Sequence, residues 1–160
     1  MDKLVERILE IENLLNIDKN IKSNLTIDEK INLLIERFDN EIYKEPKDEL
    51  INSSFEVMLF GIHLPRITEK EKIDINLVHD CQSKIWLVVE ETNGLINLRA
   101  GSDVMMLEGF LKLLFIVFNF ETRESILKSD ISFIEKLGFN LHTKQTIYKL
   151  FNVIKKKIKT

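Results

Sequence analysis

A hairpin signal at Asn93-Gly94 is the feature that most constrains the fold of this chain. The pair follows residues 85–89, which are rich in β-branched and aromatic side chains, and leads into residues 95–99. Asn-Gly favours the positive φ angles of a tight turn between antiparallel strands. Residues 73–77 alternate apolar and polar side chains, which is the pattern of a half-buried strand. The sequence therefore predicts a small three-stranded antiparallel sheet.

Apolar residues at helical spacing predict helices before and after this sheet. The predicted helices are 4–15, 26–38, 50–60, 103–118, 122–127, a short helix that Asp130 caps and Gly138 ends, and a last helix that Thr143 opens and that reaches residue 158. Thr26 and Glu29 form a capping box for the second helix. Ser102 is the predicted N-cap of helix 103–118, which is apolar around its circumference and should be the central core helix. The order α-α-β-β-β-α-α predicts an α+β domain with helices packed on the sheet.

Composition and charge indicate one globular domain. The chain has 160 residues, of which 44% are hydrophobic and 31% are charged, and such a chain can bury a sizeable core. A formal net charge of −3 gives no reason to expect a nucleic-acid partner. Asp2 and Glu6 replace the basic start of a signal peptide, and the apolar run 104–120 is short for a membrane span and contains Glu108. We therefore expect a cytoplasmic protein without membrane contact, as a monomer or weak dimer.

Cys81 is the residue with the clearest reactive potential. A lone cysteine is most often a small buried hydrophobic residue, but residues 79–84 form a polar turn between two predicted strands, and such turns lie at the surface. His79 and Lys84 are close to the thiol in sequence, and nearby cations lower a thiol pKa and favour the thiolate. The single cysteine excludes an internal disulfide, and the three scattered histidines show no metal-ligand spacing, so we expect no bound metal.

Two kinds of chemistry can be weighed for this thiol. A cysteine hydrolase needs a base and an orienting group beside the thiol, and no such pair can be assigned among His63, His79 and His142. A sulfur carrier needs only an accessible thiolate, a shielding pocket and a docking surface, because attack on a sulfane sulfur resembles thiol–disulfide exchange. A domain with one cysteine suits the carrier better.

Four motifs stand in a fixed order along the chain: T-I-D-E-K at 26–30, F-G-I-H-L-P at 60–65, N-L-V-H-D-C-Q-S-K-I-W at 76–86, and S-D at 102–103 with G-F at 109–110. In residues, order and spacing they resemble the SufE family of sulfur acceptors. The resemblance covers residues from Thr26 to the C-terminus, and it implies a SufE/IscU-like fold for a domain 26–160 preceded by an additional helix in residues 1–25.

The resemblance also implies a function. Cys81 would accept persulfide sulfur from a SufS-type cysteine desulfurase, stimulate that enzyme, and pass the sulfur to a SufBCD-like scaffold complex for iron–sulfur cluster assembly. The chain would then be a carrier rather than an enzyme, with no cofactor of its own, because the pyridoxal phosphate belongs to the desulfurase. His79, Asp80, Gln82 and Ser83 match loop and partner-facing positions. Asp103 matches the family acid at the start of the core helix, beside the cysteine loop.

Two departures from the family pattern leave a second interpretation open. Asp80 stands where the family usually has glycine, and a carboxylate beside Cys81 should raise the thiol pKa. Gln145 stands where the family has an arginine near the start of the last helix. The alternative is therefore a SufE-like binding or regulatory module that docks on a desulfurase or another partner and transfers sulfur weakly.

Overall fold

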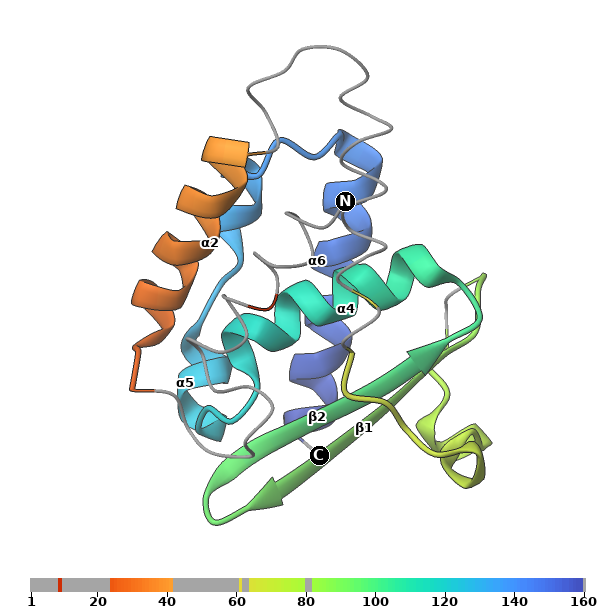
Figure 1. The fold of residues 1–160 in the computed structure, drawn as a ribbon. Coiled ribbons are helices and arrows are strands. Elements are labelled where there is room, and N and C mark those ends of the chain that lie inside the picture. Colours follow the sequence, from red (N-terminus) through yellow and green to blue (C-terminus); the bar gives the residue numbers. More distant parts are fainter. Residues whose placement is uncertain (1–8, 10–23, 42–60, 62–63, 80–81, 160) are drawn as a thin grey trace.

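The computed structural model describes residues 9, 24–41, 61, 64–79 and 82–159. The elements in chain order are α2 (Ile27–Glu41), η2 (Glu69–Glu71), η3 (Asp74–Asn76), β1 (Ile85–Thr92), β2 (Leu95–Ser102), α4 (Met105–Phe118), α5 (Arg123–Lys128), η4 (Ser132–Lys136) and α6 (Leu141–Lys159), where η denotes a 3-10 helix (Figure 1). The predicted helix 4–15 lies outside the described residues apart from the exposed Leu9, and the predicted helix 50–60 lies outside them entirely. The described residues form an α+β fold, as the sequence predicts.

The hairpin follows the sequence closely. β1 and β2 pair antiparallel from Ile85 opposite Ser102 to Thr92 opposite Leu95. The turn residues Asn93 and Gly94 have φ angles of 53° and 79°. Positive φ at both central residues is the backbone of a type I′ turn, whose twist matches that of the flanking strands.

The predicted strand 73–77 is wrong. Residues 74–76 of this segment form the 3-10 helix η3 instead. Of the predicted strand, only Leu77 forms a β-bridge, with Trp86 of β1. The side chains of Ile73 and Ile75 are 51% and 78% exposed, so the alternation does not mark a buried face. The Asn76 side-chain amide donates to the Glu71 carbonyl at 2.8 Å, and such local bonds compete with strand pairing. Within the described residues the sheet therefore has two strands.

Short segments cover the edge of β2 that β1 leaves open. The main-chain N–H of Ala100 donates to the Pro65 carbonyl at 2.9 Å, and the N–H of Ile67 donates to the Ala100 carbonyl at 3.2 Å. Farther along, the Asn119 side chain accepts from the Leu98 N–H at 2.7 Å and donates to the Leu98 carbonyl at 3.2 Å. Pairing of this kind protects an edge from contact with other strands.

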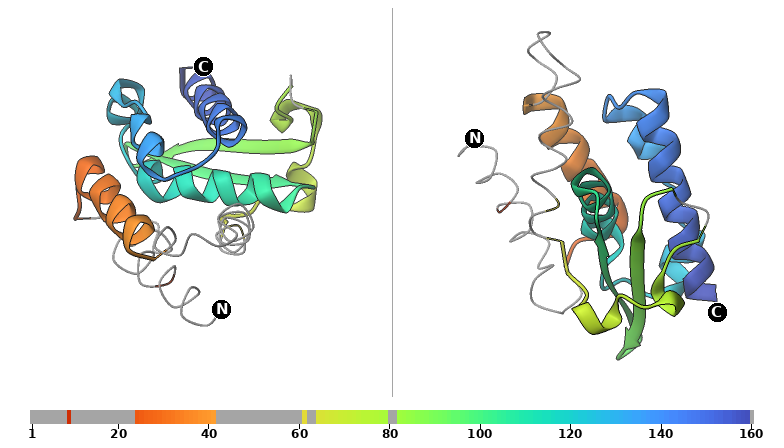
Figure 2. Two further views of the ribbon diagram at one scale, coloured as in Figure 1. Left: turned by 90° about the horizontal axis from the view of Figure 1, so that it is seen from above. Right: turned by 90° about the vertical axis from the view of Figure 1, so that its right-hand side faces the viewer.

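Helix α4 is the centre of the core, as predicted, and every residue from 108 to 118 is buried. It packs against α2, α6 and β2, while α6 also packs against α5 and β1. Figure 2 shows the hairpin with α2 and α4 toward one side and α6 toward the other. In the part of the chain that the structure describes, no helix is long and apolar enough to cross a membrane.

A buried ion pair ties α2 to the end of α4. Lys30 Nζ lies 2.7 Å from Glu121 Oε1 and donates to the Val117 carbonyl at 3.2 Å. The predicted capping box begins α2: the Thr26 N–H donates to Glu29 Oε1 at 3.0 Å, and the Glu29 N–H donates to Thr26 Oγ1 at 3.1 Å. The T-I-D-E-K motif thus supplies both the start of α2 and its anchor in the core.

The predicted starts of the two long helices need correction. α4 begins at Met105 with Val104 as its N-cap, so Asp103 lies before the helix rather than in its first turn. The reason is that Ser102 still pairs with Ile85 in the hairpin, which keeps the chain extended at this point. α6 begins at Leu141 rather than Thr143.

Asparagine and threonine side chains begin the helices of the C-terminal part. Asn140 Oδ1 accepts the Thr143 N–H at 2.9 Å, which places the cap of α6 before the predicted residue. Thr122 Oγ1 accepts the Ser125 N–H at 3.2 Å and is the N-cap of α5, which covers Arg123–Lys128 close to the predicted helix 122–127. Such side-chain acceptors satisfy the N–H groups that the first turn of a helix leaves without a partner.

Candidate functional site

The loop that contains Cys81 begins and ends at paired residues. Leu77 bridges to Trp86, and the Val78 N–H donates to the Ile85 carbonyl at 2.7 Å. Cys81 and Asp80 themselves lie outside the described residues. Residues 79–84 are therefore confined between two neighbouring points of the fold, and we call them the Cys81 loop.

The described side chains of the Cys81 loop face solvent. His79, Gln82 and Lys84 are exposed and Ser83 is half-buried. The anchors on either side, Val78 and Ile85, are 6% and 1% exposed. A polar loop between two buried apolar anchors lies at the surface because its own side chains gain nothing from burial. The roles of His79, Gln82 and Ser83 toward a partner remain predictions.

Ser102 and Asp103 contact the last residue of this loop. Ser102 Oγ donates to the Lys84 carbonyl at 2.7 Å. The Asp103 N–H points to the same carbonyl at 3.4 Å, and its side chain is exposed. The structure thus brings the main chain of Asp103 beside the loop, although it does not place its carboxylate at the start of the helix.

Glu108 and Arg66 support Ser102 from the side of the core helix, and the sequence analysis did not assign either residue to the site. Glu108 Oε2 accepts the Ser102 N–H at 3.2 Å and forms an ion pair with Arg66 Nη1 at 2.6 Å. Glu108 could have been noticed in the sequence because it is a charged residue within an otherwise apolar run. Arg66 directly follows Leu64-Pro65, and nothing in the sequence pattern indicates its role.

Gly61 and Gly109, which belong to two of the motifs, lie in close contact where the chain approaches α4. A Cβ atom on Gly61 would lie 2.9 Å from the Gly109 main-chain N, which is closer than real contacts allow. Glycine is therefore required for this close approach. The Gly61 carbonyl also accepts from Arg66 Nη2 at 3.0 Å. The motifs at 60–65 and 109–110 are thus parts of one contact.

Charged side chains fix η2 against the outer face of the hairpin. Arg99 donates to both Glu71 carboxylate oxygens at 2.6 and 2.7 Å and to Glu90 at 2.5 Å. The hydrogen bond from Arg99 lowers the pKa of Glu71 to about 2, and both carboxylates raise the pKa of Arg99. Lys72 Nζ lies 5.6 Å from the centre of the Trp86 ring, within the range of a cation–π contact. These groups satisfy one another, so the arrangement is structural.

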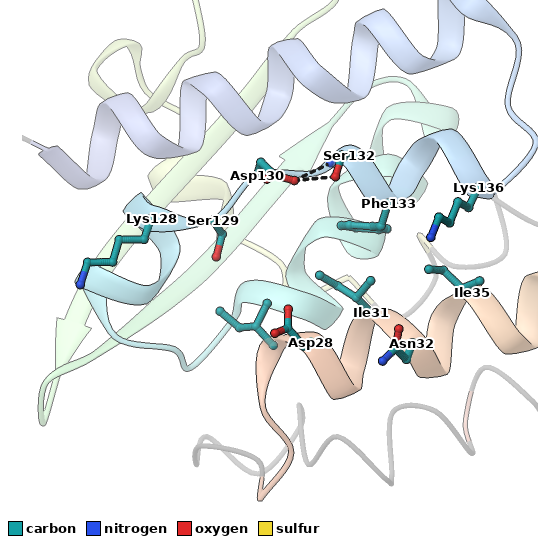
Figure 3. A pocket seen from close by; sticks show the side chains of 11 residues that line it. Asp28, Ile31, Asn32, Ile35, Lys128, Ser129, Asp130, Ser132, Phe133 and Lys136 are labelled. Carbon is teal, nitrogen blue, oxygen red and sulfur yellow. Dashed lines mark hydrogen bonds between the residues drawn. The ribbon is translucent and has the colours of Figure 1, made fainter.

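A separate cavity of about 440 Å³ lies between α2 and residues 128–136. Ile31 and Phe133 face each other across it, and Asp130 is held by Ser132 at its rim (Figure 3). No described residue of the Cys81 loop lines this cavity. Among the residues that the structure describes, no group of three or more histidine, cysteine, aspartate or glutamate side chains could hold a metal ion.

The fold and the loop define a class: a small α+β domain with an antiparallel hairpin, a buried core helix and a short polar segment whose sequence contains the only cysteine of the chain. Residues 50–160 match the model of the SufE family, described as the Fe-S metabolism associated domain. The match covers more than half of the chain, and the chain belongs to this family. The family works with cysteine desulfurases, and its domain links the chain to iron–sulfur metabolism.

A solved structure supports the fold. The chain is similar to a hypothetical protein from Thermus thermophilus, determined in solution, with a TM-score of 0.58. The match covers 81% of this chain and 93% of that chain at 15% sequence identity. At this identity the likeness shows that the fold is shared.

Proposed function

We propose that this chain is a sulfur acceptor that takes persulfide sulfur on Cys81 from a SufS-type cysteine desulfurase. It stimulates that enzyme and passes the sulfur to a SufBCD-like scaffold complex for iron–sulfur cluster assembly. The chain acts as a carrier and not as an enzyme, and it needs no cofactor, because the desulfurase brings the pyridoxal phosphate. We place the carrier in the cytoplasm as a monomer or weak dimer, with residues 26–160 as the acceptor domain.

The observation that carries the proposal is the setting of the only thiol in the chain. Cys81 lies in sequence between His79 and Gln82, which are both exposed, in a loop closed by the hydrogen bond from Val78 to Ile85. A thiol in such a loop can be presented to a partner while the fold behind it stays intact. Membership of the SufE family, whose domain is associated with Fe-S metabolism, supports sulfur transfer as the chemistry of this thiol.

The transfer step needs one thiolate and no change of total oxidation state. The Cys81 thiolate attacks the outer sulfur of the persulfide on the desulfurase cysteine. A new S–S bond forms on Cys81, the old S–S bond breaks, and its electron pair stays on the desulfurase cysteine as a thiolate. This is the displacement of thiol–disulfide exchange, whose rate depends on the thiolate fraction and on access.

The neighbours of Cys81 in sequence adjust this thiolate in opposite directions. His79 and Lys84 carry or can acquire positive charge, which favours the thiolate. Asp80 carries negative charge, which disfavours it. Asp80 and Gln145 are the observations that favour the alternative, a SufE-like module that docks on a desulfurase but transfers sulfur weakly.

Intact-mass analysis distinguishes these functions. The chain is incubated with a SufS-type desulfurase and free cysteine, and we expect a gain of one sulfur atom that dithiothreitol removes. The Cys81→Ser variant should bind the desulfurase but show no gain, since it has no thiol. A sulfur adduct on that variant would overturn the assignment. Stable binding without an adduct on the unchanged chain would support the docking module instead.

A further inference from the structure

The cavity between α2 and residues 128–136 is a groove with an apolar floor, and we call it the α2 groove. Ile27, Ile31 and Ile35 recur at every fourth residue of α2 and line one wall, and Phe133 lines the other (Figure 3). The three isoleucines are half-buried, and they extend about 12 Å along the helix axis. A half-open apolar run of this length is stabilised when a second surface removes it from water.

The two walls of the α2 groove carry charges of opposite sign. Asp28 and Asn32 lie on the α2 wall, whereas Lys128 and Lys136 lie on the facing wall. All four residues are exposed. The acidic sign of the α2 wall continues along the helix with the exposed Glu36. A partner surface that fits the groove therefore needs basic groups on one side and acidic groups on the other.

These charges bind no other group within the described part of the chain. Neither the ion pairs nor the side-chain hydrogen bonds there include Asp28, Lys128 or Lys136. Asp130 also lines the groove, but its carboxylate accepts from the Ser132 N–H at 2.9 Å and from Ser132 Oγ at 2.7 Å. Local bonds hold the Asp130 charge, so the facing wall presents its two lysines.

A second copy of this chain matches this pattern of signs. If α2 of one copy lies in the groove of another, the acidic side of that helix meets Lys128 and Lys136 of the second copy. A two-fold axis then repeats the same contact in the opposite sense, because an isologous interface uses one surface twice. Such an interface needs both members of each charge pair on one surface, and the α2 groove has them. A surface of one sign would repel its own copy.

We propose that two copies of this chain associate about a two-fold axis through the α2 groove, with Asp28 of each copy facing Lys128 and Lys136 of the other. The inference goes beyond the proposed function and does not rest on it, since no described residue of the Cys81 loop lines the groove. Stable interfaces bury about 1,200–2,000 Å² in total, and a groove of about two helical turns is short for such an area. The dimer is therefore weak, and salt weakens it further because salt screens exposed charges.

The test is sedimentation equilibrium of the full chain at up to about 1 mM, a concentration at which weak complexes form. Dithiothreitol is present, so that Cys81 forms no disulfide between copies. We expect a monomer–dimer equilibrium in low salt. Lys128→Glu together with Lys136→Glu makes both walls acidic, and we call this chain the acidic variant. The change should raise the dissociation constant about tenfold or more, because attraction becomes repulsion in both halves of the interface.

Two lysines on α6 provide a matched control. Lys156 and Lys159 are exposed and belong to the helix that Figure 2 shows toward the other side of the hairpin. Lys156→Glu together with Lys159→Glu changes the net charge by the same amount as the acidic variant. It should leave the dissociation constant nearly unchanged, so that a general effect of net charge is separated from an effect of the groove.

Mixing two variants decides whether the two walls meet. Asp28→Lys together with Asn32→Lys makes both walls basic, and this basic variant should also fail to dimerise. An equal mixture of the acidic and basic variants should form a dimer with one copy of each, because every wall then meets a wall of opposite sign. Circular dichroism shows whether each variant is folded.

Each outcome supports the inference or overturns it. A chain that stays monomeric at about 1 mM in low salt overturns it, and the groove is then left to solvent or to a different protein. A dimer that the acidic variant leaves unchanged overturns it as well, and so do folded variants that remain apart in the mixture. Asp28 lies in the first turn of α2; if the basic variant does not fold, the acidic variant and its α6 control still decide. Dimerisation without a sulfur adduct on Cys81 would refute the proposed function alone.

Discussion

The buried pair of Lys30 and Glu121 makes a demanding test of the fold. Both side chains are 2% exposed, and their nitrogen and oxygen atoms are 2.7 Å apart. Lys30→Met removes the cation while it keeps a side chain of similar length. Glu121 then loses the ammonium group of Lys30 within the core, although it keeps its place in the chain segment that pairs with β2.

The expected cost follows from this burial. Breaking a buried pair by removing one partner destabilises a protein by about 3–5 kcal/mol, because the desolvation of the remaining charge is no longer offset by that partner. Small domains have a total stability of about 5–15 kcal/mol, so Lys30→Met should bring the chain close to unfolding. Adding Glu121→Gln should recover part of the loss, since a neutral amide needs no counter-charge.

The assay is urea unfolding followed by far-ultraviolet circular dichroism. Lys144→Met is a matched control, because Lys144 lies at the same 2.7 Å from Glu135 but the two side chains are 24% and 50% exposed. An exposed pair of this kind contributes about 0–1 kcal/mol. If the two lysine variants lose the same small free energy of unfolding, the reasoning about the buried pair is refuted.

Two further predictions concern the hairpin. The Arg99 hydrogen bond lowers the pKa of Glu71 from 4.5 to about 2. The unfolded chain therefore binds this proton at higher pH than the folded chain. The contribution of Glu71 to stability is complete above about pH 4.5 and is lost as the pH falls toward about 2. Glu71→Gln should flatten this part of the curve of melting temperature against pH, and an unchanged slope would contradict the ion pair. Asn119→Ala leaves both main-chain groups of Leu98 without their partner. It should cost about 1–3 kcal/mol for each group and speed hydrogen exchange of the Leu98 amide, whereas continued protection would show that another group pairs with it.

The features that the sequence predicted correctly are those with local causes. Asn93-Gly94 sets its own turn, because the φ angles that it needs are properties of the two residues themselves. The capping box of Thr26 and Glu29 likewise spans one helical turn. The apolar run of α4 has apolar residues on all sides of the helix, which predicts that the whole helix is buried, as residues 108–118 are.

Most of the features that the sequence missed depend on distant partners. The alternation at 73–77 is the exception: Ile73 and Ile75 are exposed, and the Asn76 side chain bonds to the nearby Glu71 carbonyl. Asp103 looks like the first residue of a helix, yet its N–H faces Lys84 and the helix starts later. The ion pair of Arg66 and Glu108 joins motifs far apart in the sequence, and no periodicity reveals such a pair.

The family motifs and the departures from them lie in different parts of the molecule. Gly61 meets Gly109, and Lys30 binds within the core, so these motif residues hold the fold through contacts that tolerate little change. Gln145, by contrast, is exposed on α6, and Asp80 lies outside the described residues, in sequence between the exposed His79 and Gln82. Substitutions at exposed positions seldom change stability by more than about 0.5 kcal/mol. The two departures should therefore act on the reactivity of Cys81 and on the choice of partner, with the scaffold behind the loop unchanged.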